Sequence, residues 1–114
     1  ARASNLQSIC QTIEANLGDP DLTPAKIAAQ HGMSLRYVQK LFSQSANTFS
    51  NYVRVRRLER CRADLVSPVY AQMSVTEICF RWGFNGSAHF SRAFRSQYGV
   101  PPRDYRRQAI GVED

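Results

Sequence analysis

The chain has 114 residues, of which 43% are hydrophobic, so it can bury one core or two small ones. Its formal net charge of +6 and pI near 9.7 favour an anionic partner. Every basic residue except Lys26 and Lys40 is arginine, whose planar fork suits phosphates and guanine edges, so nucleic acid is the favoured partner. No apolar run approaches the roughly 18 residues of a membrane span, and the first residues lack a signal-peptide pattern. We therefore expect a cytoplasmic protein that contacts no membrane.

Residues 4–17 are predicted to form a first helix, because apolar side chains recur on one helical face. Ser4 is placed to cap this helix and Gly18 to end it. We interpret the segment as a packing element.

A two-helix unit is predicted next. Thr23 is an N-cap followed by Pro24 at the first helical position, which starts a helix that ends at His31. We assign His31 no chemistry, since a hydrogen-bonded histidine at a helix end is the default. A turn at Gly32 and a further helix through Phe42 complete the unit.

A long helix is predicted from its cap at Thr48 to about Val66, where Ser67 and Pro68 end it. It is crowded with arginines: Arg54, Arg56, Arg57, Arg60 and Arg62. Two interpretations stay open for these, a solvated face paired with nearby acids or contact with phosphates. We do not assign them base contacts.

A second two-helix unit follows a short connector over residues 68–73. Ser74 and Glu77 form a capping box that opens a helix stopped by Gly83. A second helix starts near Ser87, and the chain then breaks before a final helix that contains Tyr105 and Arg106. From Gly111 the tail is expected to fray.

The two units are an internal repeat. The matched pairs are Ile27 and Ile78, Gly32 and Gly83, Val38 and Phe90, Phe42 and Phe94, and Tyr52 and Tyr105. Their offset drifts from 51 to 53 residues (78 − 27 and 105 − 52), so two single-residue insertions in turns account for it. The sequence therefore predicts an all-α fold with two helix-turn-helix subdomains, residues 1–47 and 67–114, joined by a long central helix over residues 48–66.

The second helix of each unit has two distinct faces at helical spacing. The inward faces are Leu35, Val38, Leu41 and Phe42 in the first unit, and Phe90, Ala93, Phe94 and Tyr98 in the second. The outward stripes are Arg36, Gln39, Lys40 and Ser43, and Ala88, Ser91, Arg92 and Arg95. Small and basic residues along a stripe permit close approach to DNA. The inward faces predict packing, so we assign Trp82, Phe84, Phe90 and Phe94 to a core rather than to a base-stacking platform.

Catalysis and metal binding are not predicted. Cys10, Cys61 and Cys79 lack a Cys-x-x-Cys spacing, and only His31 and His89 could join them as ligands. We expect all three cysteines to be small buried hydrophobic residues in a reducing compartment. The chain also lacks a nucleophile-base arrangement and a glycine-rich phosphate loop, so we predict neither a catalytic residue nor a cofactor.

The second half carries a family resemblance in three consecutive motifs: Ile78-Cys79-Phe80-Arg81-Trp82-Gly83-Phe84, then Ser87-Ala88-His89-Phe90-Ser91-Arg92-Ala93-Phe94-Arg95, then Tyr98-Gly99-Val100-Pro101-Pro102-Arg103-Asp104-Tyr105-Arg106. In this order and spacing they resemble the signature of the AraC/XylS family of bacterial transcription regulators. The resemblance implies two helix-turn-helix subdomains, each with its second helix in the major groove of promoter DNA. It also implies transcription regulation through contact with RNA polymerase, and an N-terminal sensing and dimerising domain that this chain lacks.

The resemblance places base-reading positions on both outward stripes. Together with Arg95 from the stripe analysis, the predicted DNA-binding residues are Arg36, Gln39, Lys40, Ser87, Ala88, Ser91, Arg92 and Arg95. Gln39 and Ser91 can equally be plain solvent positions. Two other function classes stay open: a basic helical module that binds an acidic protein partner such as RNA polymerase, and an enzyme that uses Cys61. Arg60 and Arg62 flank that cysteine, but neighbouring side chains on a helix point apart.

Overall fold

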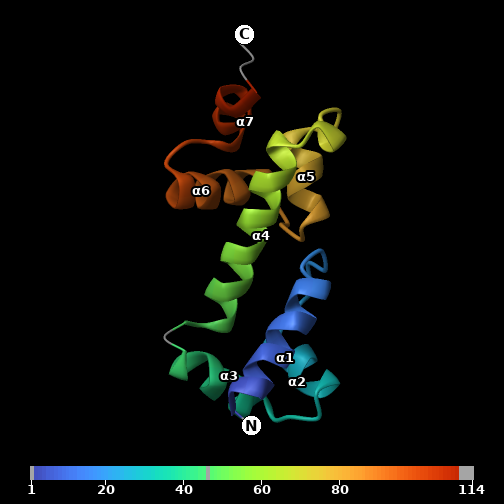
Figure 1. The fold of residues 1–114 in the computed structure, drawn as a ribbon, viewed down its shortest axis with the longest axis vertical. Coiled ribbons are helices and arrows are strands. Elements are labelled where there is room, and N and C mark those ends of the chain that lie inside the picture. Colours follow the sequence, from blue (N-terminus) through green and yellow to red (C-terminus); the bar gives the residue numbers. More distant parts are fainter. Residues whose placement is uncertain (1, 46, 111–114) are drawn as a thin grey trace. The chain divides into compact units, whose positions relative to one another are not determined.

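A computed structural model describes residues 2–45 and 47–110, in which all regular structure is helical (Figure 1). The helices are α1 (Arg2–Ala15), α2 (Pro24–Gln30), α3 (Leu35–Gln44), α4 (Phe49–Val66), α5 (Val75–Arg81), α6 (Ser87–Tyr98) and α7 (Pro102–Ile110), with a short 3-10 helix at Pro68–Tyr70. The predicted all-α fold, with two helix-turn-helix subdomains and a long central helix, is confirmed.

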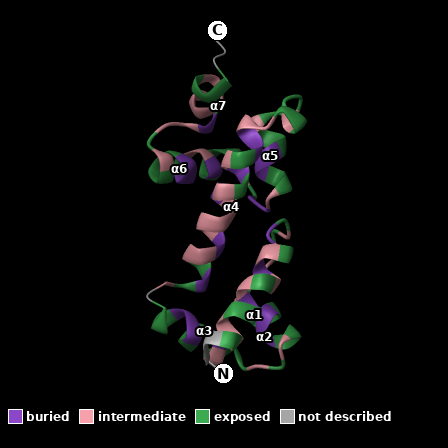
Figure 2. Ribbon diagram, in the orientation of Figure 1, coloured by how far each residue is buried: buried purple, intermediate pink, exposed green. Residues whose placement is uncertain are grey.

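The chain divides into two compact units, residues 1–56 and 57–114, which we call unit 1 and unit 2. The boundary falls inside α4. Unit 1 therefore consists of α1 to α3 with the first part of α4, and unit 2 of the remainder of α4 with α5 to α7. Each unit has its own buried core (Figure 2).

The core of unit 1 is built from one apolar face of each of its helices and from Leu17 in the turn after α1. Its buried residues are Ile9, Ile13, Leu17, Ile27, Ala28, Val38, Leu41, Phe42, Phe49 and Val53. Phe42 joins α3 to α4 through an edge-to-face contact with Phe49, with ring centroids 5.6 Å apart. Outside this core, Arg56 of α4 donates two hydrogen bonds to the carboxylate of Glu14 on α1, at 2.7 and 2.8 Å. This paired contact holds α1 against the start of α4.

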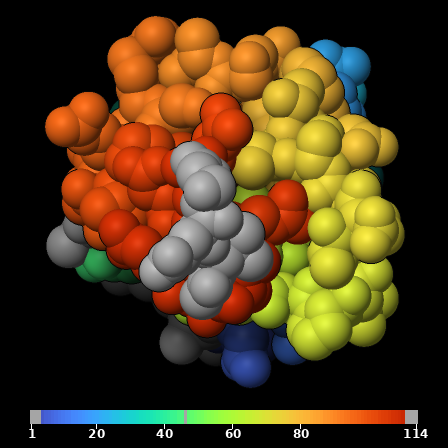
Figure 3. Space-filling model, turned by 90° about the horizontal axis from the view of Figure 1, so that it is seen from above, coloured from blue at the N-terminus to red at the C-terminus, as the bar shows by residue number. Residues whose placement is uncertain are grey.

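The core of unit 2 contains three of the four aromatic residues assigned to packing. Its buried residues are Leu58, Cys61, Leu65, Ile78, Cys79, Phe84, Phe90, Ala93 and Phe94. Trp82 is half-buried and packs against this core, and its indole N–H donates to the carboxylate of the buried Asp64 at 2.7 Å. Figure 3 looks onto this unit and shows α6 (orange) next to both α5 (gold) and α7 (red).

The local capping signals correspond to the observed helix starts. The side chains of Thr23, Thr48 and Ser74 accept hydrogen bonds from the backbone of α2, α4 and α5, and Ser74 and Glu77 form the predicted capping box. The prediction for Ser4 was wrong, since α1 already begins at Arg2 and ends at Ala15, before Gly18. The tail from Gly111 lies outside the described residues.

The expected burial is confirmed for Cys61 and Cys79 and was wrong for Cys10. Cys61 and Cys79 have no exposed surface, whereas Cys10 is half-buried. Burial raises the pKa of the Cys61 thiol, and it raises that of Cys79 to about 11. A thiolate at Cys61 is therefore disfavoured, which argues against a nucleophile at this position.

Candidate nucleic-acid interface

The turn between the two helices has the same hydrogen-bonding geometry in both units. In unit 1 the turn glycine, Gly32, has a φ of 63°, and the Met33 N–H donates to the Ala28 carbonyl at 2.9 Å. In unit 2 Gly83 has a φ of 89°, and Phe84 N–H donates to the Cys79 carbonyl at 3.2 Å. Only glycine adopts this left-handed conformation without a steric cost, so the repeat at these glycines reflects one shared turn.

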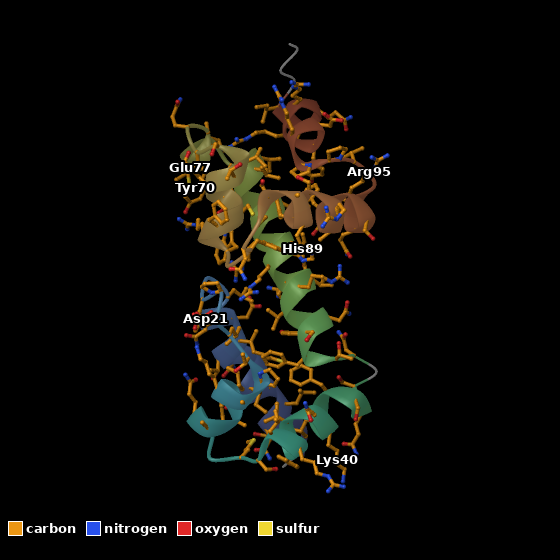
Figure 4. The ribbon with its side chains drawn as sticks, turned by 180° about the vertical axis from the view of Figure 1, so that it is seen from behind. Asp21, Lys40, Tyr70, Glu77, His89 and Arg95 are labelled. Atoms are coloured by element: carbon orange, nitrogen blue, oxygen red, sulfur yellow. The ribbon has the colours of Figure 1, made fainter. Side chains whose placement is uncertain are left out.

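The outward stripe of α3 is exposed along its full length. Arg36, Gln39, Lys40 and Ser43 are exposed, while Val38, Leu41 and Phe42 on the opposite face are buried. Ser34 caps the helix by accepting a hydrogen bond from the Tyr37 N–H at 3.0 Å. Figure 4 shows Lys40 projecting from α3 away from the body of unit 1.

The stripe of α6 is shorter in reach and carries fewer polar side chains. Ala88, Arg92 and Arg95 of this stripe are exposed and Ser91 is half-buried, and the neighbouring Ser87 at the start of the helix is exposed as well. Figure 4 shows the Arg95 side chain pointing outward near the far end of α6. Because Ala88 has no polar group and Ser91 is short and partly covered, the arginines supply most of the hydrogen-bonding capacity of this face.

The cations of both stripes lack partners among the residues that the structure describes. Arg36, Lys40, Arg92 and Arg95 form no side-chain hydrogen bond or ion pair within residues 2–45 and 47–110. An exposed cation without an internal partner is available to an external anion, and arginine can bind one through two parallel hydrogen bonds.

The arginines of α4 are engaged within the protein instead. Arg54 donates to Asn51 at 2.6 Å, and Arg56 holds Glu14. Arg62 donates to the Tyr105 hydroxyl at 3.4 Å, a bond that raises the pKa of this guanidinium. Arg60 lies over the Trp82 ring at 5.8 Å. These contacts favour the structural interpretation of the arginine-rich helix over phosphate contact.

Leu35 was wrongly assigned to the inward face of α3. Its side chain is 41% exposed at the start of the helix, beside the outward stripe. The internal repeat indicates that Leu35 is exposed, because an offset of 52 pairs it with the polar residue Ser87 (87 − 35). Leu35 therefore belongs to the exposed end of α3.

In the part of the chain that the structure describes, no group of three or more His, Cys, Asp or Glu residues is placed to hold a metal ion. No helix in residues 2–45 or 47–110 is long and apolar enough to cross a membrane.

Two helix-turn-helix units, each with an exposed stripe that includes cations on its second helix, define a DNA-binding protein of the helix-turn-helix class. A family profile described as "Helix-turn-helix domain" matches residues 27–108. The crystal structure of a transcriptional regulator from Chromobacterium violaceum, described as containing an AraC-type DNA-binding domain, is similar with a TM-score of 0.85 and 29% identity, over 97% of this chain and 96% of that one. The C-terminal domain of AraT, a response regulator from Geobacillus stearothermophilus, gives a TM-score of 0.82 and 27% identity, over 90% of this chain and 84% of that one.

The curated relatives show to which family the chain belongs. The chain is 36% identical to the transcriptional activator RhrA of Rhizobium meliloti and 39% identical to the transcriptional activator NphR of a Rhodococcus species, covering 96% and 94% of this chain. It belongs to the AraC/XylS family of helix-turn-helix transcription regulators and corresponds to the DNA-binding domain. The chain spans about a third of these relatives, 34% of RhrA and 31% of NphR. These relatives are regulators rather than enzymes, in agreement with the sequence-based expectation.

Proposed function

We propose that the chain binds a promoter site in double-stranded DNA with sequence specificity, and that α3 and α6 of one monomer enter successive major grooves. The observation that carries this proposal is the exposure of the two stripes, whose four cations have no partner within the described residues. Affinity then comes from phosphate and base contacts by the same two helices.

The two half-sites differ in chemistry, since the stripes differ. Arg36 and Lys40 carry donors that suit guanine O6 and N7, and Gln39 can pair with adenine through two hydrogen bonds. In α6, Arg92 has comparable reach, Arg95 suits phosphate, and Ser87, Ala88 and Ser91 permit close approach. One monomer therefore recognises one asymmetric site.

The proposal also covers the location and the partners of the protein. Regulation of transcription places it in the bacterial cytoplasm with promoter DNA, and RNA polymerase is the proposed protein partner. We also propose that the whole protein has a sensing and dimerising domain; the chain spans only about a third of the curated relatives, which leaves room for such a domain. The competing function, a basic module that binds an acidic protein and no DNA, has less support because the exposed cations lie at matched positions on the second helix of each helix-turn-helix unit.

The test is selection of bound sites from a random duplex pool with the wild-type chain, Lys40→Ala and Arg92→Ala. Each substitution is expected to cost about 1 to 3 kcal/mol and to relax base preference in one half-site only, a different half-site for each variant. Ala88→Gln is expected to add a base preference in the half-site affected by Arg92→Ala.

Lys26→Ala and Arg103→Ala are the matched controls. Both residues are exposed cations outside the stripes, so they should leave the selected sequence unchanged. The two-half-site proposal is wrong if Lys40→Ala and Arg92→Ala alter the same base pairs, or if both lower affinity equally for every sequence.

A further inference from the structure

An aromatic ring with a polar group occupies the same position in α3 and α6, the second helices of the two units, which we call the docking helices. Tyr37 is the third residue of α3 and His89 is the third residue of α6. The internal repeat pairs them at an offset of 52 (89 − 37), the offset that also relates the two outward stripes. Neither ring belongs to the buried cores, since Tyr37 is half-buried and His89 is exposed.

Both rings lie at the edge of the outward stripe rather than at its centre. Residues three apart on a helix are neighbours about 60° apart around the axis, which places Tyr37 beside Lys40 and His89 beside Arg92. A side chain at the centre of a docked helix reaches the floor of the major groove, where the base edges are. A side chain at the edge faces the wall of the groove, which is formed by phosphates.

Each ring is held from outside its own helix. The Asn5 side-chain amide on α1 donates to the Tyr37 hydroxyl oxygen at 3.0 Å. This bond leaves the phenolic hydrogen free to donate, and no acceptor for it is present in residues 2–45 and 47–110. A hydroxyl that accepts one hydrogen bond becomes a better donor for the next. In unit 2, the His89 ring lies against Phe84, with ring centroids 6.4 Å apart.

We infer that Tyr37 and His89 each donate a hydrogen bond to a backbone phosphate at the wall of the major groove, and that Asn5 acts as a positioning residue for the Tyr37 hydroxyl. This inference rests on the proposed function and adds one anchoring contact per unit. Both contacts leave base preference unchanged, because every nucleotide presents the same phosphate. They fix instead the angle at which each docking helix enters its groove.

The test measures the affinity of the 114-residue chain for a fluorescent duplex recovered by site selection. Tyr37→Phe and His89→Phe keep the rings and remove the donors, and each should weaken binding about tenfold, as expected for a hydrogen bond to a charged group. The duplex is then remade with single neutral methylphosphonate linkages at each position in turn. One linkage in the first half-site should weaken the wild type about tenfold but leave Tyr37→Phe nearly unaffected, and a different linkage should do the same for His89→Phe.

Asn5→Ala tests the positioning role through a double-mutant comparison. It should weaken binding about threefold in the wild-type background and have no effect in the Tyr37→Phe background, because its effect passes through the missing hydroxyl. Thermal unfolding of Tyr37→Phe shows whether this variant retains the fold. The methylphosphonate scan tests the phosphate contacts independently of the Asn5 variant. Affinities within twofold of the wild type, or the lack of any linkage that separates the wild type from the Phe variants, would overturn the inference alone. If the wild-type chain binds no duplex at all, both the proposed function and this inference are wrong.

Discussion

Arginine has two roles in this chain, and the contacts of each guanidinium distinguish them. Arg56 lies on a helix dense in basic residues, yet its two hydrogen bonds to Glu14 commit it to holding α1 and α4 together. Arg92 has no partner within residues 2–45 and 47–110 and remains available to DNA. Paired arginines of this kind contribute to the fold, so basic residue density alone does not locate the binding surface.

At the same scale, Cys61→Ala should change the pH dependence of folding but not DNA affinity. Burial raises the pKa of this thiol above its unfolded value of about 8.5, so the folded state retains the proton while the unfolded state loses it. The stabilising effect is fully present below about pH 8.5 and is lost as the pH rises from there. Each such thiol adds a slope of about −1.4 kcal/mol per pH unit to the free energy of unfolding.

Urea denaturation between about pH 9.5 and pH 10.5, where the unfolded thiol is almost fully ionised, measures this slope. Cys61→Ala should remove about 1.4 kcal/mol per unit of it, while the contribution of Cys79, whose pKa is raised to about 11, remains. Duplex affinity should be equal in reducing and oxidising buffer for both proteins. An unchanged slope, or an oxidation-dependent loss of binding that Cys61→Ala abolishes, would show that the thiol is accessible.

At the scale of elements, α7 secures the connection between α4 and α5. The Arg106 guanidinium donates to three backbone carbonyls, those of Leu65, Tyr70 and Met73, at 2.9, 3.0 and 2.7 Å. The Leu65 carbonyl lies in the last turn of α4, where carbonyl groups lack a helical partner. One side chain thus satisfies the end of a helix and the connector that follows it.

Arg106→Met should therefore destabilise unit 2 by about 2 to 3 kcal/mol, because it removes the side-chain donor to the Leu65 and Met73 carbonyls, while the Tyr70 carbonyl keeps its bond from the Met73 N–H. The measurement is urea denaturation followed by fluorescence of Trp82, the single tryptophan of the chain. Arg103→Met on the exposed face of the same helix is the control and should change stability by less than about 0.5 kcal/mol. Equal effects of the two substitutions would mean that the carbonyl contacts contribute nothing measurable.

At the scale of the whole molecule, the net charge of +6 and the unpartnered stripe cations predict salt-dependent binding. Each phosphate neutralised on a duplex contributes about −0.9 to the slope of log affinity against log salt concentration. If each of the four cations Arg36, Lys40, Arg92 and Arg95 displaces one counterion from the duplex, whether it contacts a base edge or a phosphate, the slope is about −3.6 (4 × 0.9). Arg56→Met should leave the slope unchanged, since Glu14 already holds that guanidinium. A slope near zero between low and physiological salt would favour an acidic protein partner over DNA.

Local signals in the sequence were sufficient to predict the order of the helices, the caps at Thr23, Thr48 and Ser74, and the internal repeat, but not the bounds of α1. Capping residues such as Thr23 and Ser74 act within one turn, and apolar periodicity reports which side of a helix is covered. These short-range rules also located the two outward stripes, because the stripes are the residues left over on each docking helix.

Only the tertiary structure decided which of several residues of the same type pair within the protein and which are available to a partner. Arg56 and Glu14 are 42 residues apart, and Asn5 and Tyr37 are 32 apart, so no local pattern indicates that these side chains meet. Leu35 was misassigned for a related reason: its helical phase predicts burial, but no partner helix covers the start of α3 at that point among the described residues. Burial and pairing depend on which elements pack together, and that packing is set by contacts distant in sequence.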